Sequence, residues 1–332
     1  MLEIYGTLGP ACASADLLEQ MLSTGMTGVR LNLSHVTLAQ AADQVEALHT
    51  AARRLGVKPK LLIDMQGPEL RIGPMSHDVH MIEGKNILLH QPGGIPLPEV
   101  ILQHITPGQE LWMDDGKIRV EVFEARGGLR GHVIQGGVLK SRKSVAIPGL
   151  NLWLPALTES DRANLRVAKD YGVTGVMQPF VRCREDLEAV REELEANGCK
   201  HVRLFAKIEN RLGLEKLEEL LPASDEIVIA RGDLGNAVPL WELPRVQKEI
   251  AALCRRHHKS FMIVTQMLAS MEHSPVPTRA EVSDIFNAVL DGAASVMVTG
   301  ETAAGKWPVE TIRYLTETVR QAEAYKKEGN MK

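Results

Sequence analysis

The stretch "HVRLFAKIENRLG", from His201 to Gly213, decides how this sequence folds. Its first half alternates residue by residue in the manner of a buried β-strand. Lys207 and Glu209 stand two residues apart near the end of this strand, and a strand places residues at that spacing on the same face. An ammonium and a carboxylate side by side at a strand end indicate a functional site there.

Seven further apolar runs have the length and composition of strands. They begin at Glu3, Gly28, Lys60, Gly172, Asp225, Ser260 and Ala294. Helical patterns lie between them, as in "SADLLEQMLSTG", where Ser14 can cap the start and Gly25 can end the helix. Eight strands that each lead into a helix predict an α/β fold, a (β/α)8 TIM barrel.

One segment interrupts this alternation after the third strand. It contains the turn signals "QPGG", "TPGQ", "ARGG" and "IQGG" and the alternating run "IRVEVFEA". We therefore expect a small all-β domain, a β-barrel lid, at 73–147. The catalytic barrel is then formed by 1–72 and 148–332.

Composition excludes several classes of protein. The 332 residues are 44% hydrophobic and 24% charged, with a formal net charge of −4, which does not favour a nucleic-acid or membrane partner. The four cysteines form no C-x-x-C pair, which favours a reducing compartment. The sequence lacks an 18-residue apolar run and a signal-peptide pattern, so we expect a cytoplasmic protein.

Polar residues gather where the predicted strands end, and barrel active sites form at those carboxyl ends. A single polar strand end usually means only that the chain meets solvent. The full set carries more weight because it combines acids, arginines and a lysine, as a metal-assisted phosphate site does. Its members are Arg30, Asn32, Ser34, Asp64, Lys207, Glu209, Arg231, Asp233, Thr265, Thr299 and Glu301.

The residue types suggest a division of labour. Glu209 and Asp233 come from adjacent strands and could share one Mg²⁺, which favours carboxylates and substrate oxygens. Lys207 could then reach a phosphoryl group on that metal, and the planar fork of Arg30 could pair with the same phosphate. Gly232 would let backbone N–H groups approach an anion at a helix start.

The segments around these residues also occur in a known order. "TLGPA", "GVRLNLSH", "DMQGPELRIG", "MDDGKI", "AKIEN", "ARGDLG", "TQMLASM" and "TGETAAGKWP" follow one another along the chain. In this the sequence resembles the pyruvate kinase family over nearly its whole length. The resemblance implies the same barrel with an inserted β domain, and phosphoryl transfer from phosphoenolpyruvate to ADP, giving pyruvate and ATP.

The resemblance also implies roles for individual residues. Glu209 and Asp233 would bind Mg²⁺ or Mn²⁺, Lys207 would stabilise the migrating phosphoryl group, and Arg30 would contact it. Thr265 would help to protonate the enolate carbon or position its water, and the backbone at Gly232 and Asp233 would hold the substrate carboxylate. The monovalent-cation shell would comprise Asn32, Ser34, Asp64 and the Met65 carbonyl. The nucleotide contacts would be Asn32, His35, Arg71 and Lys143.

The sequence departs from the family pattern in three places. It ends soon after the eighth helix, so we expect a short form without the family's C-terminal domain. Met65 and Gln66 replace a Thr and a Lys of potassium-dependent members while Glu69 is kept, which leaves a K⁺ requirement open. Pro179 and Ala269 replace a Ser and a Glu that are common in the family.

Two other functions remain as alternatives. One is a non-catalytic, pyruvate-kinase-like protein that binds substrate or a partner and has a regulatory role. The other is a Mg²⁺-dependent barrel enzyme that handles the enolate of pyruvate, such as an aldolase. The retained Lys207 argues against the first, and the inserted domain with Lys143 argues against the second. A homo-oligomer through the barrel faces is also left open.

Overall fold

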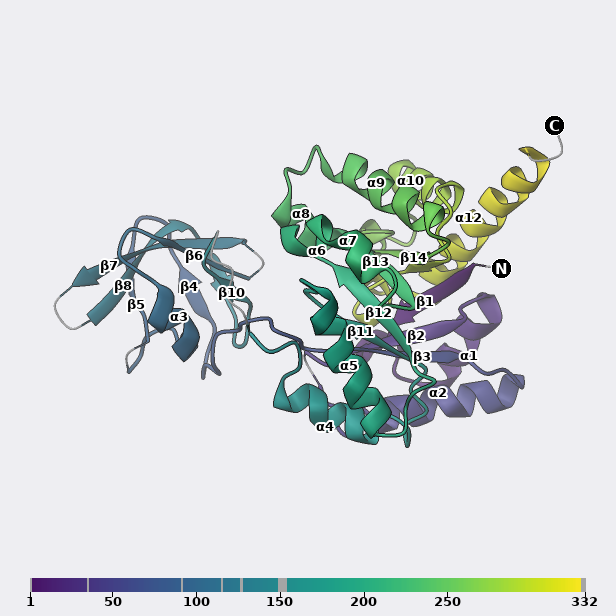
Figure 1. Ribbon diagram of the computed structural model, residues 1–332, viewed down its shortest axis with the longest axis horizontal. Coiled ribbons are helices and arrows are strands. Elements are labelled where there is room, and N and C mark those ends of the chain that lie inside the picture. The colour runs from purple at the N-terminus through teal and green to yellow at the C-terminus, as the bar shows by residue number, and fades with distance from the viewer. Residues whose placement is uncertain are drawn as a thin grey trace. The chain divides into compact units, whose positions relative to one another are not determined.

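The computed structural model describes residues 2–34, 36–90, 92–114, 116–125, 128–148 and 154–329. The chain divides into two compact units, one formed by residues 1–67 and 155–332 and the other by residues 68–154 (Figure 1). The second unit therefore extends a few residues beyond both ends of the 73–147 segment expected from the sequence.

The first unit is built around a closed barrel of eight parallel strands in the order β1-β15-β14-β13-β12-β11-β3-β2. These are β1 (Glu3–Thr7), β2 (Gly28–Asn32), β3 (Lys60–Asp64), β11 (Gly175–Gln178), β12 (Arg203–Ile208), β13 (Glu226–Ala230), β14 (Ser260–Val264) and β15 (Ser295–Met297). All eight strands predicted from the sequence are present, which confirms the (β/α)8 barrel.

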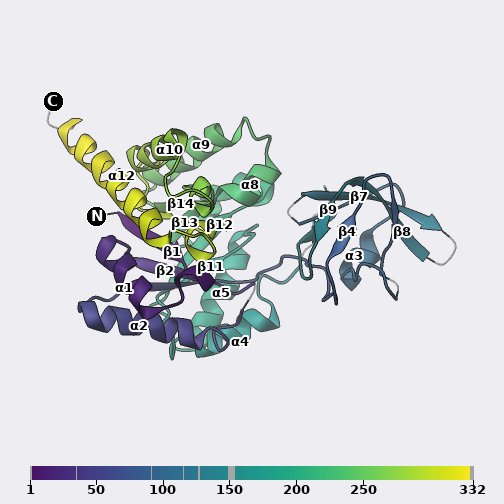
Figure 2. The same ribbon diagram turned by 180° about the vertical axis from the view of Figure 1, so that it is seen from behind.

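Helices surround this barrel on its outside (Figures 1 and 2). They are α1 (Ala15–Thr24), α2 (Ala42–Leu55), α4 (Glu159–Val167), α5 (Arg184–Ala196), α6 (Arg211–Glu215), α7 (Leu217–Leu220), α8 (Arg231–Ala237), α9 (Leu243–Arg256), α10 (Arg279–Leu290), α11 (Gly300–Ala303) and α12 (Pro308–Gly329), with the 3₁₀ turns η1 (Pro10–Cys12) and η2 (Ala269–Glu272). Ser14 caps α1 by accepting a hydrogen bond from the Leu17 N–H, as predicted. In the described part of the chain, no helix is long and apolar enough to cross a membrane.

The inside of the barrel changes character along its axis. An apolar cluster fills the middle, with fully buried Tyr5 and Phe205 as its aromatic members. At the amino ends of the strands lies a polar cluster that we call the ionic floor. It consists of Glu3, Lys60, Arg203, Glu226 and Ser295. Charged side chains thus occupy the strand starts as well as the strand ends.

Arg203 joins the two carboxylates of the ionic floor. Its guanidinium lies 3.2 Å from a carboxylate oxygen of Glu3 and 2.5 Å from one of Glu226. Glu3 also pairs with Lys60, and Ser295 donates a hydrogen bond to Glu226. The cluster therefore ties β1, β3, β12, β13 and β15 together at one end of the barrel, where polar networks serve stability rather than catalysis.

The second unit consists mainly of antiparallel strands. These are β4 (Val79–Met81), β5 (Asn86–Leu88), β6 (Glu110–Met113), β7 (Ile118–Ala125), β8 (Gly128–Gln135), β9 (Gly137–Leu139) and β10 (Val145–Ala146). Among the described residues they form a five-stranded sheet, β10-β6-β7-β8-β5, and a two-stranded sheet, β4-β9, where the sequence predicted a β-barrel.

The second unit also contains a helix, α3 (Glu99–His104), so the expectation of an all-β domain was wrong in this detail. The segment lies between the proline of "LPE" and the "TPGQ" turn, and these turn signals concealed it. The helix forms because it buries Ile101 in the core of the unit, and this tertiary contact outweighs the local signals.

Candidate active site at the barrel mouth

Lys207 stands at the centre of the charged residues where the barrel strands end. Its Nζ lies 3.0 Å from Oε1 of Glu209 and 3.2 Å from each carboxylate oxygen of Asp64. The side chains of Asp64 and Glu209 are buried, and that of Lys207 is only 13% exposed. Lys207 and Glu209 therefore point to the same side of β12, as their spacing predicted, and the ammonium bridges two carboxylates.

Arg30 approaches the same carboxylate from the neighbouring strand β2. Its Nε and Nη2 donate to Oδ2 of Asp64 over 2.9 and 2.6 Å. Asp64 thus faces two cations. Burial alone would raise the pKa of Asp64, but Lys207 and Arg30 outweigh burial and hold that pKa below its usual value. This pairing was not predicted, because the resemblance placed Asp64 in a cation shell.

The pKa of Lys207 moves in the opposite direction. Burial alone would lower it, but the carboxylates of Asp64 and Glu209, with a smaller contribution from Asp233, outweigh burial and raise it well above its usual range. Lys207 therefore carries its positive charge at neutral pH.

Glu209 and Asp233 are the two carboxylates that the sequence proposed for a divalent cation. Glu209 is 3% exposed, and its Oε2 accepts a hydrogen bond of 2.9 Å from the Phe180 N–H. Asp233 lies in the first turn of α8. Among the residues that the structure describes, no three His, Cys, Asp or Glu side chains are grouped as a metal site. Two carboxylates suit Mg²⁺, which takes its other ligands from water and substrate phosphates.

Thr265 follows β14 in an unusual backbone conformation. Its φ of +79° is an outlier for a β-branched residue. Arg231 holds this turn, because its Nε and Nη2 donate to the Thr265 carbonyl over 3.1 and 2.7 Å, while Nη1 pairs with Asp284 at 2.6 Å. A Cβ on Gly232 would lie 3.1 Å from Cγ2 of Thr265, so glycine lets the two segments approach.

Arg231, a member of the polar strand-end set, thus has its partners within the barrel unit. Its guanidinium is used to fix Thr265 and to pair with α10 through Asp284. The strand-end pattern alone could not reveal this, because Asp284 belongs to a helix 53 residues further along the chain.

The residues assigned to a monovalent-cation shell lie close to this cluster in the sheet. Asn32 and Asp64 are directly paired in the register of β2 and β3. Oδ1 of Asn32 accepts a hydrogen bond of 3.1 Å from the Ser34 N–H. Met65 is buried beside β11, where its N–H donates to the Met177 carbonyl.

The proposed nucleotide contacts are distributed differently. His35 lies outside the described residues. Arg71 and Lys143 belong to the second unit, where Arg71 donates to the Arg142 carbonyl over 2.9 Å and Lys143 pairs with Asp114 at 2.7 Å.

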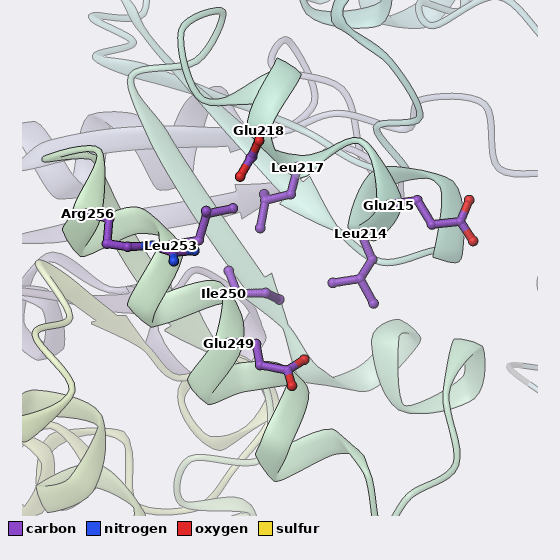
Figure 3. Close-up of a pocket in the computed structure, with 8 residues that line it drawn as sticks. All are labelled: Leu214, Glu215, Leu217, Glu218, Glu249, Ile250, Leu253 and Arg256. Atoms are coloured by element: carbon purple, nitrogen blue, oxygen red, sulfur yellow. The ribbon is translucent and has the colours of Figure 1, made fainter.

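A hollow of about 340 Å³ lies elsewhere on the barrel unit, between α6, α7 and α9 (Figure 3). Leu217, Ile250 and Leu253 are its buried apolar members, and Glu215, Glu218 and Glu249 line it with exposed carboxylates. None of its lining residues belongs to the charged cluster around Lys207.

The fold and this cluster define a class, the (β/α)8 barrels that carry converging charged side chains at the carboxyl ends of their strands. Comparison with known families identifies one family within this class. The model of the pyruvate kinase barrel domain matches residues 1–312. The chain belongs to the pyruvate kinase family.

Individual relatives agree with this assignment. The chain is 36% identical to the pyruvate kinase of Geobacillus stearothermophilus over 332 aligned residues and 38% identical to that of Aeropyrum pernix over 328. It is also 38% identical to the pyruvate kinase of Methylorubrum extorquens. These alignments cover 97 to 98% of this chain, but 57, 71 and 68% of the respective relatives.

Proposed function

We propose that this chain is a pyruvate kinase that transfers the phosphoryl group of phosphoenolpyruvate to ADP. The observation that carries the proposal is the position of Lys207, whose buried ammonium is held between Asp64 and Glu209 beside Arg30. A charged donor held in place by its neighbours can meet negative charge that develops on a migrating phosphoryl group.

The charge balance at the mouth supports a requirement for a divalent cation. Arg30 and Lys207 bring two positive charges, whereas Asp64, Glu209 and Asp233 bring three negative ones. Such a site repels a phosphorylated carboxylic acid. One Mg²⁺ on Glu209 and Asp233 reverses the sign, and it would supply the charge stabilisation that phosphoryl transfer needs.

The residues of the chain then have separate tasks. Lys207 and Arg30 exchange part of their pairing with Asp64 for the phosphoryl oxygens. The backbone at Gly232 and Asp233 takes the substrate carboxylate. Thr265, fixed by Arg231, positions the proton or water for the enolate carbon. Asn32 and His35 of the barrel contact the nucleotide. Arg71 and Lys143 contact it from the second unit, which acts as a lid.

We further propose that any requirement for a monovalent cation is weak. Asp64 would be the charged ligand of that cation beside Asn32, Ser34 and the Met65 carbonyl, yet it already pairs with Arg30 and Lys207. Rates measured in K⁺ and in tetramethylammonium should differ little. A rate that collapses without K⁺ would contradict this part of the proposal.

A coupled assay for pyruvate release, with phosphoenolpyruvate, ADP and Mg²⁺ or Mn²⁺, tests the main proposal. The wild-type chain should turn over, and Asp233→Asn should lose metal binding and activity together because one of two metal carboxylates is gone. A wild-type chain that binds Mg²⁺ and phosphoenolpyruvate without turnover would support the non-catalytic alternative instead.

A further inference from the structure

Asp161, which the reaction proposed above does not use, has more hydrogen-bond partners than a helix cap requires. It lies in the first turn of α4 and is fully buried. Its Oδ2 accepts from both the N–H and the hydroxyl of Thr158, over 2.9 and 2.8 Å, which completes a capping box. A capping box needs no further donors.

Two additional donors come from a distant part of the chain. The Gln66 N–H donates to Oδ1 of Asp161 over 2.8 Å, and the Gly67 N–H donates to Oδ2 over 3.0 Å. Gln66 and Gly67 precede Asp161 by 95 and 94 positions in the sequence. They are also the last residues of the barrel before the chain passes into the second unit at Pro68.

The segment that returns from the second unit is hydrogen-bonded close to the same part of the barrel. The barrel unit resumes at Pro155, and the side-chain amide of Gln178 donates to the Ala156 carbonyl over 2.9 Å. Gln178 is fully buried at the end of β11, and its neighbour Pro179 would lie 2.5 Å from a Cβ on Gly67. The leaving and returning segments therefore both pack against the end of β11 and the start of α4.

We infer that Asp161 is a positioning residue, the clasp that fastens the leaving segment to the start of the returning helix α4. Through it the two crossings to the second unit, at Gly67 and Pro155, are kept at one fixed place on the barrel. The nucleotide contacts proposed for Arg71 and Lys143 lie beyond these crossings, so their placement depends on the clasp. This last consequence rests on the proposed function, whereas the clasp itself does not.

The two variants Asp161→Asn and Thr158→Val separate a clasp from a simple cap. Asparagine can keep its oxygen on the Thr158 side, but its NH₂ group then faces the Gln66 N–H, donor against donor. Thr158→Val removes the cap hydroxyl and leaves both bonds to the leaving segment. Asp161→Asn therefore disturbs the bond to the leaving segment, whereas Thr158→Val disturbs only the helix cap. Both variants remain close in shape to the natural residues.

Hydrogen exchange of the full chain is the first test. In the wild type, the Gln66 and Gly67 amides should exchange as slowly as those of β3. Asp161→Asn should speed exchange at Gln66 by about ten- to a hundredfold, because a charge-assisted bond is lost. Thr158→Val should leave Gln66 and Gly67 unchanged and speed only the first turn of α4. The clasp would be contradicted if the Gln66 and Gly67 amides of the wild type exchanged as fast as solvent-exposed amides. It would also be contradicted if both variants changed their exchange equally.

Kinetics provide the second test. Asp161→Asn should raise KM for ADP severalfold and leave KM for phosphoenolpyruvate unchanged, while Thr158→Val should change neither. Equal weakening of both substrates, or an unchanged KM for ADP despite faster exchange at Gln66, would overturn the link between clasp and nucleotide. If the wild-type chain has no turnover, the proposed function fails and the exchange experiment still decides the clasp.

Discussion

Replacing Lys207 by Met tests the roles proposed for the barrel mouth, since Met keeps an aliphatic stem and removes the charge. In the substrate-free protein, Asp64 retains Arg30, whereas Glu209 loses the ammonium 3.0 Å away and keeps its hydrogen bond from the Phe180 N–H. Removing one partner of a buried ion pair costs about 3–5 kcal/mol. We expect about 3 kcal/mol here, because one of the two carboxylates remains paired.

Mg²⁺ should restore much of this stability. The variant presents the same carboxylates with one competing cation fewer, so its Mg²⁺ affinity should rise. A ligand at a hundred times its Kd stabilises a protein by about 2.7 kcal/mol, which nearly offsets the expected loss. Urea unfolding without Mg²⁺ measures the loss of stability in the variant, and urea unfolding with Mg²⁺ measures how much of it the metal restores.

Turnover should fall by ~10²–10³ even when Mg²⁺ is saturating, because Lys207 would act on charge that develops in the transition state. Lys60→Met is the matched control. Lys60 pairs with Glu3 in the ionic floor and is 35% exposed, so turnover should persist and stability should change by at most about 1 kcal/mol. If Lys207→Met keeps more than a tenth of the wild-type rate under saturating Mg²⁺, the role assigned to Lys207 is wrong.

Further predictions concern the floor, the mouth and the second unit. Arg203→Met should lower the free energy of unfolding by about 1–3 kcal/mol, because it removes a donor from the fully buried Glu226. Glu226→Gln should cost less in the same urea titrations, because burial raises the pKa of Glu226 and disfavours its charge; similar losses would contradict this. Gly232→Ala should lower turnover about tenfold with an unchanged Tm, because the added Cβ would lie 3.1 Å from Cγ2 of Thr265 and displace that side chain. Lys143→Ala should raise KM for ADP. Lys117 also lies near the Asp114 carboxylate, at 3.9 Å, and Lys117→Ala should leave KM for ADP unchanged; equal effects would remove Lys143 from the nucleotide site.

The barrel could be predicted from sequence because its signals are local. The period of two in β12 placed Lys207 and Glu209 on one face, and the structure confirms this. Capping residues such as Ser14 marked helix starts correctly. The helix α3 was missed because burial of Ile101, a tertiary effect, decides its conformation.

Pairings between charges were harder to predict, since they depend on strand order and stagger. Asp64 is 34 residues from Arg30 and 143 from Lys207, and nothing local shows that one carboxylate serves both. The ionic floor did leave a signal. Arg203 precedes Lys207 by four residues, so the period of two points it into the same barrel interior. The φ of +79° at Thr265 left no signal, because threonine rarely adopts it.

The most direct test of the central claim follows both phosphorus-containing substrates at once. Phosphorus NMR of the wild-type chain with phosphoenolpyruvate and ADP should show the phosphoenolpyruvate signal replaced by the γ-phosphate of ATP in equal amount. The conversion should require Mg²⁺, because the mouth without it carries more carboxylates than cations. Loss of phosphoenolpyruvate to free phosphate, or no change in the spectrum with Mg²⁺ present, would contradict phosphoryl transfer to ADP at this site.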